Sequence, residues 1–172
     1  MNFPILSSLI LLPVIGALFL FFTKDKDGNN LTAKYVSLFT TIVNFLISIY
    51  LWTSFDQSTS SFQFIEDREW INGFINYKVG VDGISILFII LTTFITPLCI
   101  ISVNNTIKVR LRDFLIAILI MESFMIGVFC ALDLVVFYLF FEAGLIPMFL
   151  IIGIWGGPKR VYSAFKFFLY TL

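Results

Sequence analysis

The stretch that decides the fold runs from Phe114 to Trp155 and reads FLIAILIMESFMIGVFCALDLVVFYLFFEAGLIPMFLIIGIW. Its charged residues are Glu122, Asp133 and Glu142. A helix needs about 20 apolar residues to cross the roughly 30 Å hydrocarbon core of a bilayer, so this stretch is long enough for two crossings. Asp133 lies near its middle, where an aspartate can end one helix and cap the next. The stretch therefore predicts two consecutive, antiparallel transmembrane helices.

The rest of the chain is also apolar enough for a membrane. In the whole chain of 172 residues, 59% are hydrophobic and 13% are charged. Soluble proteins have about 45–50% apolar and about 25% charged residues. Apolar windows at about 3–22, 31–52 and 84–103 predict three more helices, and 161–172 predicts about two-thirds of a sixth. Together with 114–132 and 134–155, they predict an all-α integral membrane protein of about six transmembrane helices, in a single domain over residues 1–172.

The positive charges gather in alternate loops. Nine of the eleven basic residues fall in the first, third and fifth inter-helix regions: Lys24, Lys26, Lys34, Lys108, Arg110, Arg112, Lys159, Arg160 and Lys166. The other two, Arg68 and Lys78, lie in the second region. Because Lys and Arg near helix ends stay on the cytoplasmic or matrix side, this pattern predicts an N-terminus outside and the basic loops inside.

A long outer loop separates the second and third expected helices. It runs from about Thr53 to Gly83 and is first polar and then acidic. Its later part, Phe74 to Val81, partly alternates between apolar and polar residues, which predicts a short strand or extended segment on the membrane surface. Asp82 directly precedes the next helix and is expected to cap it.

Composition excludes several kinds of site. The sequence has no His and a formal net charge of zero, which excludes His-based acid–base chemistry and gives no electrostatic case for nucleic acid. Cys99 and Cys130 lie far apart in apolar runs, and we interpret them as packing residues rather than a disulfide or metal site. No phosphate-binding loop, nucleophile motif or metal-ligand cluster is recognisable, so no cofactor or metal is expected in the chain.

Two carboxylates lie inside the apolar runs. Glu122 comes eleven residues before Asp133 and Glu142 nine after it, which places each roughly 14–16 Å below the outer surface, so the two can be neighbours. An ionised carboxylate at that depth costs at least about 2.5–3.5 kcal/mol. It must be protonated, paired or hydrated, and each state allows it to exchange a proton. We predict proton transfer at Glu142 and possible proton transfer at Glu122; the alternative is a protonated Glu that holds helices together.

Other residues bear on this prediction. Pro147 has no N–H, so the carbonyl of Ala143 loses its helical partner next to Glu142, and such a break can hold the water that proton transfer needs. Lys166 lies about 9 Å past the basic interface; it can extend back to the headgroups or take part in a proton relay, and both readings stay open. Asn44 is interpreted as an interhelical hydrogen bond rather than a site.

Several segments carry recognisable motifs: LDL at 132–134, FFEAGLIPM at 140–148 and GIWGG at 153–157. They resemble the fifth-helix signature of one known family, chain M of respiratory NADH–quinone oxidoreductase, which is subunit 4 of complex I. Further similarity lies in GVDGIS at 80–85, LTT at 91–93, TPL at 96–98 and KFFLYT at 166–171.

The resemblance implies an antiporter-like bundle in which the glutamate matching Glu142 carries protons in a half-channel. Glu122 is matched by Glu in some bacterial-type members of the family. The implied surroundings are a bacterial cell membrane or mitochondrial inner membrane, with the lipid bilayer, protons and other complex I membrane subunits as partners. NADH, FMN, iron–sulfur clusters and quinone would be bound elsewhere in the complex, which makes this chain one subunit of an enzyme without a redox centre of its own.

Members of the family continue beyond the sixth helix, so we expect this chain to correspond to their N-terminal portion. Two alternatives stay open. One is a subunit of the related multisubunit cation/proton antiporters, which share a Glu at the Glu142 position; the LIPM continuation at 145–148 favours complex I. The other is a non-catalytic scaffold or remnant in which both glutamates serve only as contacts between helices.

Overall fold

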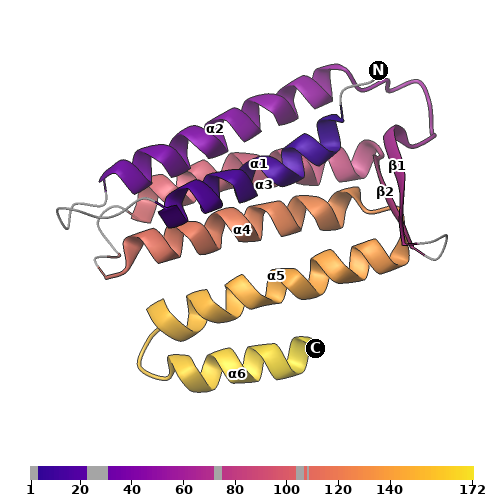
Figure 1. Cartoon of the computed structure of the whole chain (residues 1–172). Helices are drawn as coiled ribbons and strands as arrows, with labels where there is room; N and C mark the ends of the chain where they lie inside the picture. The colour runs from indigo at the N-terminus through magenta and orange to yellow at the C-terminus, as the bar shows by residue number, and fades with distance from the viewer. Residues whose placement is uncertain (1–3, 23–30, 72–74, 104–106, 108) are drawn as a thin grey trace.

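The fold is a bundle of six helices with a small β-hairpin at one end (Figure 1). The computed structural model describes residues 4–22, 31–71, 75–103, 107 and 109–172. The helices are α1 Ile5–Phe22, α2 Leu31–Thr53, α3 Gly83–Ser102, α4 Leu111–Cys130, α5 Leu134–Trp155 and α6 Arg160–Thr171. The six expected helices are thus confirmed. Phe3, Lys24, Lys26, Phe74 and Lys108, which also entered the sequence-based predictions, lie outside the described residues.

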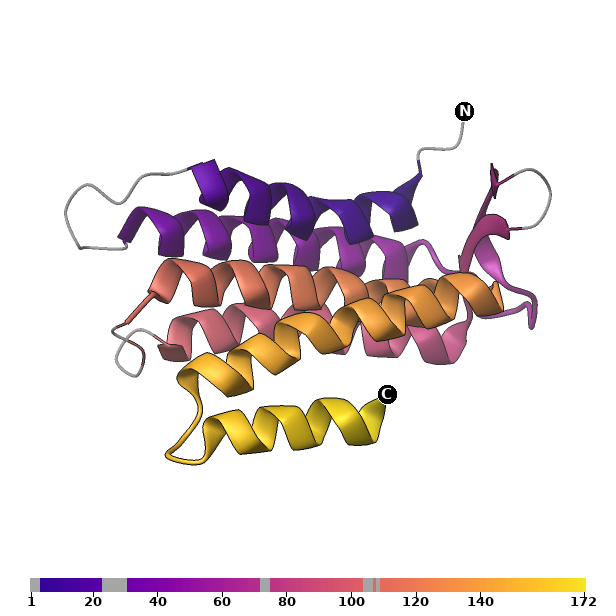
Figure 2. The same cartoon turned by 60° about the horizontal axis from the view of Figure 1, so that its bottom comes forward.

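Five of the described helices, α1 to α5, are long and apolar enough to cross a membrane. The sixth, α6, has 12 residues and therefore extends roughly 18 Å, less than the thickness of a bilayer core. It packs against α5, at the edge of the bundle, as the turned view shows (Figure 2). The protein is therefore a multi-pass membrane protein, as its hydropathy indicates.

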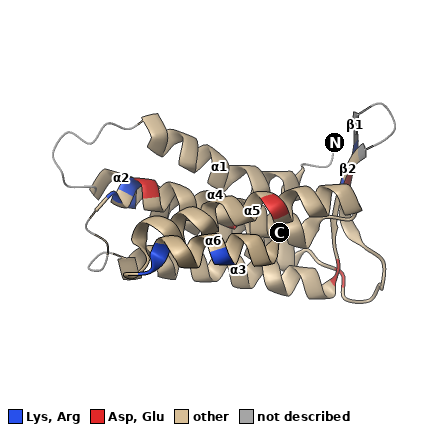
Figure 3. Cartoon of the chain, turned by 90° about the horizontal axis from the view of Figure 1, so that it is seen from below, with Lys and Arg blue, Asp and Glu red and all other residues tan. Residues whose placement is uncertain are grey.

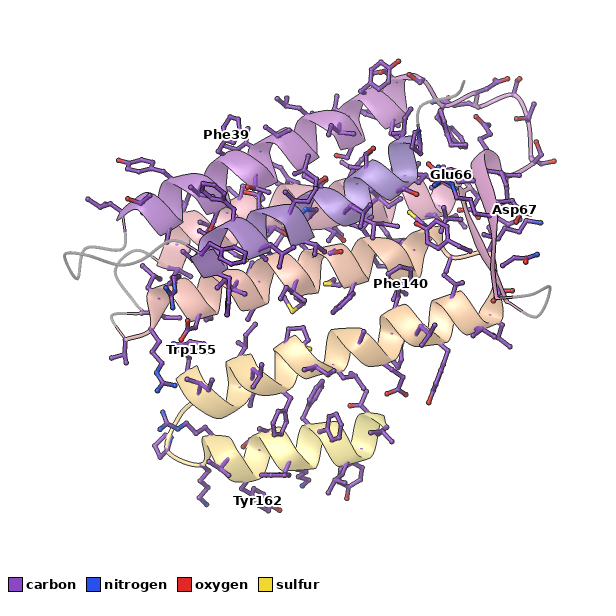
Figure 4. The ribbon with its side chains drawn as sticks, viewed as in Figure 1. Phe39, Glu66, Asp67, Phe140, Trp155 and Tyr162 are labelled. Atoms are coloured by element: carbon purple, nitrogen blue, oxygen red, sulfur yellow. The ribbon has the colours of Figure 1, made fainter. Side chains whose placement is uncertain are left out.

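Apolar side chains cover the outside of the bundle, as a lipid environment requires. Phe39 of α2, for example, is 71% exposed and points away from the other helices (Figure 4). The interior contains small polar residues as well as apolar ones. Those buried on α2 and α3 are Ser37, Thr40, Thr41, Asn44, Ser48, Thr92, Thr93 and Thr96. Small polar residues let membrane helices approach closely and hydrogen-bond to one another.

Charged positions gather toward the two ends of the bundle (Figure 3). Lys34, Arg112 and Arg160 lie in the first turns of α2, α4 and α6, which begin at the end opposite the hairpin (Figure 1). The middle of the ribbon is mostly uncharged, apart from an acidic position on α5 and a basic one on α6 (Figure 3). The described first-turn charges from alternate loops therefore lie at one end of the folded chain.

The outer loop forms a hairpin where the sequence predicted only one extended segment. Strands β1 Gln63–Ile71 and β2 Ile75–Val81 pair antiparallel, with Arg68 opposite Tyr77. The expected extended segment is β2. We did not predict β1, because its sequence QFIEDREWI contains a run of charges in place of regular alternation. The structure shows the matching irregularity, since the pairing of β1 with β2 shifts register twice.

The hairpin is hydrogen-bonded to the bundle at two places, the start of α1 and the connection between α4 and α5. On one side, the carboxylate of Glu66 accepts the N–H of Leu6 at 2.9 Å and the N–H of Ser7 at 3.3 Å, and the Ser7 hydroxyl also donates to it (Figure 4). These are free amides of the first turn of α1, where a negative charge is favoured. On the other side, the N–H of Leu132, between α4 and α5, donates to the carbonyl of Lys78 at 3.0 Å.

Candidate functional site

Glu122 lies in the centre of the bundle, on α4. Its side chain is 1% exposed, and its Oε1 accepts a hydrogen bond from the amide Nδ2 of Asn44 on α2 at 2.9 Å. The interhelical hydrogen bond expected for Asn44 is therefore confirmed. The sequence did not indicate which helix would receive it, because the two partners are 78 residues apart in the chain.

Further buried hydrogen bonds join the helices around this pair. The hydroxyl of Ser123, which follows Glu122, donates to the carbonyl of Ile10 on α1 at 2.5 Å. Ser48 of α2 and Thr93 of α3 share a hydrogen bond of 2.8 Å between their hydroxyls. The buried carboxyl thus lies among four helices that polar contacts hold together, and sequence reasoning missed both of these contacts.

Glu142 has different surroundings on α5. This helix buries few of its residues, and Glu142 is half-buried. The hydroxyl of Tyr138, one turn earlier, interacts electrostatically with its carboxylate. Pro147 lies inside the same helix and is buried, so the carbonyl of Ala143 next to Glu142 has no N–H partner from that residue. Spacing of i and i+4 between a tyrosine and a glutamate was the sequence signal for this contact.

Among the described residues, no hydrogen bond joins Glu122 to Glu142. Glu122 interacts with Asn44 on α2, whereas Glu142 interacts with Tyr138 on its own helix. Between them, α4 and α5 pack through Gly127, which faces the ring of Phe140 (Figure 4). The two carboxyls therefore have separate partners, and the helices that carry them are packed directly together.

Lys166 lies on an exposed face of α6. Its ammonium nitrogen is 6.0 Å from the ring centre of Tyr162 and 5.8 Å from that of Tyr170, one turn before and one turn after it. A cation over aromatic faces at this range is attracted to them. The ion pairs formed between described residues, Lys78 with Asp67 and Arg112 with Asp113, do not include Lys166.

An apolar groove of about 680 Å³ runs between α1, α4 and α5. Arg68 and Tyr77 of the hairpin line one part of it, and Ser123 and Ala143, the residues after Glu122 and Glu142, line another. Burial raises the pKa of the Tyr77 hydroxyl above its ordinary value of 10.0, with a smaller opposing effect from its hydrogen bond to Ser7. This tyrosine is therefore neutral at physiological pH.

The chemistry available here is the binding and release of protons. Among the described residues, no group of three or more His, Cys, Asp or Glu lies close enough to hold a metal ion. Among the described residues, the acidic and basic side chains that lie beyond the first turns of the helices are Glu122, Glu142 and Lys166, each in the setting given above. Fold and site together define a class: multi-pass membrane helix bundles that carry carboxyl groups within the hydrocarbon layer.

The comparisons with known proteins define the family. Residues 8–128 match the family described as NADH-ubiquinone oxidoreductase chain 4, amino terminus, and residues 131–172 match the family described as NADH:quinone oxidoreductase/Mrp antiporter, TM. The first match covers more than half of the chain. The chain therefore belongs to the subunit M, or chain 4, family of NADH–quinone oxidoreductase.

Individual relatives agree with this assignment. NADH-quinone oxidoreductase subunit M of Rhodobacter capsulatus is 54% identical over 97% of this chain and 33% of its own length. NADH-ubiquinone oxidoreductase chain 4 of Marchantia polymorpha is 44% identical over 97% of this chain and 34% of its own length. A chain of respiratory complex I from Thermus thermophilus superposes with a TM-score of 0.77 at 27% identity, over 96% of this chain and 32% of that one. The chain thus spans about a third of the length of the curated relatives it matches, and the match lies in their N-terminal portion, as expected.

Proposed function

We propose that this chain is the N-terminal part of a proton-translocating membrane subunit of complex I, in which Glu142 takes up and releases protons. The observation that carries the proposal is a half-buried carboxylate in the middle of a membrane helix, beside the Tyr138 hydroxyl. Other membrane subunits of the complex are its partners in a bacterial or mitochondrial inner membrane. NADH, FMN, iron–sulfur clusters and quinone bind on other subunits, which supply the driving force.

Glu142 is better placed for exchange than Glu122. Its carboxylate is half-buried and therefore open to a proton donor or acceptor from outside this bundle, whereas Glu122 is enclosed at 1% exposure. The Tyr138 hydroxyl can both donate and accept a hydrogen bond, so it can pass a proton to or from Glu142. The carbonyl of Ala143, without an N–H from Pro147, offers an acceptor for a water in the same region.

The proposal gives Lys166 no step in proton transfer. Its contacts are with Tyr162 and Tyr170 of its own helix. A long cationic side chain on the surface of a short membrane helix can bring its charge to the interface while its stem stays in apolar surroundings. We therefore assign Lys166 to anchoring of α6 near the basic end of the bundle.

The test replaces Glu142 with Gln in the assembled complex and measures proton pumping in membrane vesicles supplied with NADH and quinone. Gln keeps the size and hydrogen-bonding capacity of the side chain but cannot carry the proton. Pumping should be lost while the complex still assembles. Tyr138→Phe, which removes one hydroxyl, should slow pumping without abolishing it.

Asp133→Asn is the matched control, since it makes the same carboxylate-to-amide change on the same helix. Asp133 caps α5 by accepting the N–H groups of Val135 and Val136, and Asn caps equally well, so pumping should be unchanged. Full pumping by the Glu142→Gln complex would refute the proposal. Pumping that is absent from the wild type as well, in a complex that assembles, would favour a scaffold role.

A second candidate is a cation/proton antiporter subunit, because the description matched by residues 131–172 also names such antiporters. The match of residues 8–128 names only the oxidoreductase, which favours the first proposal. Sodium-dependent proton exchange in vesicles without NADH would support the antiporter, and exchange that requires NADH oxidation would exclude it.

A further inference from the structure

Two buried oxygen atoms inside the bundle have no hydrogen-bond partner, and they belong to residues that already contact each other. One is Oε2 of Glu122 and the other is Oδ1 of Asn44. The remaining polar atoms of the two groups, Oε1 and Nδ2, are joined by the hydrogen bond of 2.9 Å. A buried polar atom without a partner has lost its hydrogen bonds to water and gained none in return, so a contact that satisfies both oxygens together is strongly favoured.

The neighbouring polar side chains do not supply that contact. The hydroxyl of Thr41 donates to a backbone carbonyl of α2, and that of Ser123 donates to Ile10. The hydroxyls of Ser48 and Thr93 bond to each other and to carbonyls of their own helices. Their protons are therefore already in use, and the free oxygens of Glu122 and Asn44 remain acceptors without a donor.

No positive charge lies beside Glu122 either. The other polar side chains that the described part of the chain buries are serines, threonines and Asn44. An unpaired carboxylate in apolar surroundings is very unfavourable, and such a group becomes neutral instead. Burial, hydrogen-bond geometry and the absence of a buried cation among the described residues all favour a neutral, protonated carboxyl at Glu122.

We propose that Glu122 is a stably protonated carboxylic acid that forms a two-bonded acid–amide pair with Asn44. The proton lies on Oε2 and is donated to Oδ1 of Asn44, while Nδ2 of Asn44 donates to Oε1. A carboxylic acid and a carboxamide each present one acceptor and one donor side by side, so the two planar groups match. A single proton then satisfies both free oxygens and joins α2 to α4 by two hydrogen bonds.

The pair makes Glu122 a closed proton-holding site, distinct from the exchanging site at Glu142. Asn44 is a positioning residue in it, since it acts only through the carboxyl. The inference does not rest on the proposed function, because it concerns a contact inside the bundle that exists whether or not Glu142 transports protons.

Infrared spectroscopy tests the inference, because the carbonyl stretch of a protonated carboxyl lies apart from the bands of carboxylates and backbone amides. The sample is the 172-residue chain carrying Glu142→Gln, reconstituted in phospholipid vesicles at neutral pH. In this chain Glu122 is the remaining carboxyl beyond the first turn of a described helix, since Asp113 lies in the first turn of α4. We expect one protonated-carboxyl band that shifts in deuterated water and disappears when Glu122→Gln is added.

Asn44 is tested in the same background. Asn44→Leu should move the band to higher frequency, because the carboxyl loses both hydrogen bonds to the amide. Thr41→Val is the matched control on the same buried face of α2, one turn away, and its hydroxyl bonds to the backbone of α2; it should leave the band in place. Glu122→Gln should fold, since a second amide can form the same two hydrogen bonds with Asn44.

Three results would overturn the inference. The first is the absence of a protonated-carboxyl band at neutral pH. This result can be seen in the Glu142→Gln chain itself, before Glu122 or Asn44 is replaced. The second is a band that stays when Glu122 is replaced. The third is a band that Asn44→Leu does not shift, which would mean that a trapped water, and not Asn44, receives the proton.

Discussion

Asp82 shows how one side chain sets the start of a membrane helix. Its carboxylate accepts the N–H of Ser85 at 2.7 Å, in the first turn of α3, so the cap expected from the sequence is confirmed. This hydrogen bond lowers the pKa of Asp82 below its ordinary value of 3.8. A lowered pKa in the folded state means that the ionised carboxylate stabilises the fold.

We predict a pH-dependent cost for Asp82→Ala. The stabilisation is fully present above the unfolded value of 3.8 and is lost as pH falls through the lower folded value. At neutral pH the substitution should reduce the free energy of unfolding by about 1 kcal/mol, and the difference from wild type should shrink in strong acid. Unfolding by SDS in mixed micelles, followed by circular dichroism, measures both. Asp82→Asn keeps a capping side chain and should cost little; an equal loss for Asp82→Ala at neutral and acid pH would contradict the prediction.

At the residue scale, the sequence distinguished the polar residues inside apolar helices but not what they contact. Glu122, Glu142 and Asn44 stand out because their neighbours are apolar. The contact between Asn44 and Glu122 depends on which faces of α2 and α4 meet. Helical periodicity gives little guidance there, since a membrane helix is apolar on its outside as well as its inside.

At the scale of elements, the hairpin and α1 act as one unit. Glu66 supplies the acceptor for the first turn of α1, while its neighbour Asp67 points away from the bundle (Figure 4) and forms a surface ion pair with Lys78 at 3.7 Å. Adjacent acidic residues of one strand therefore have different structural roles, because successive side chains of a strand face opposite sides.

We predict that Glu66→Ala destabilises the chain and Asp67→Ala does not. Loss of Glu66 leaves the amides of Leu6 and Ser7 without their acceptor, which should cost about 1–2 kcal/mol in the same unfolding measurement. Loss of Asp67 removes only an exposed ion pair and should cost less than about 1 kcal/mol. Equal effects of the two substitutions would show that Glu66 does not cap α1.

Hydropathy predicted the helices well because each must be apolar over a length set by the bilayer. The same reasoning could not find β1, since a surface hairpin has no such constraint. Its residues pair with β2 across two register irregularities, and Phe64 adopts a left-handed backbone with φ of 53°. Local breaks of this kind remove the two-residue alternation by which a strand is recognised in a sequence.

On the scale of the whole molecule, the distribution of charge predicts the orientation in the membrane. The first turns of α2, α4 and α6 carry Lys34, Arg112 and Arg160 at the end opposite the hairpin (Figure 1). Positively charged helix ends are retained on the cytoplasmic or matrix side. The hairpin should therefore lie on the outer side.

Labelling of introduced cysteines tests this orientation. A membrane-impermeant maleimide should label Ser58→Cys, in the exposed loop before β1, from the outside of intact cells, and label Gly157→Cys only after permeabilisation. A side chain at Gly157 meets nothing within 4 Å, so the second variant should fold. Both are made with Cys99→Ala, and Cys130 is fully buried. The reverse labelling pattern would contradict the orientation, and labelling of both sites from one side would contradict the number of crossings.

The contact between Glu66 and the start of α1 also affects how the protein is made. Sixty residues of chain separate Leu6 from its acceptor. When the first helix leaves the ribosome, Glu66 has not been synthesised, and it reaches its place only after the second helix has crossed the membrane. Until then the amides of Leu6 and Ser7 lack the Glu66 acceptor. The outer end of α1 therefore receives its acceptor from a residue translated sixty positions later, so this contact forms only after the helix itself has been made.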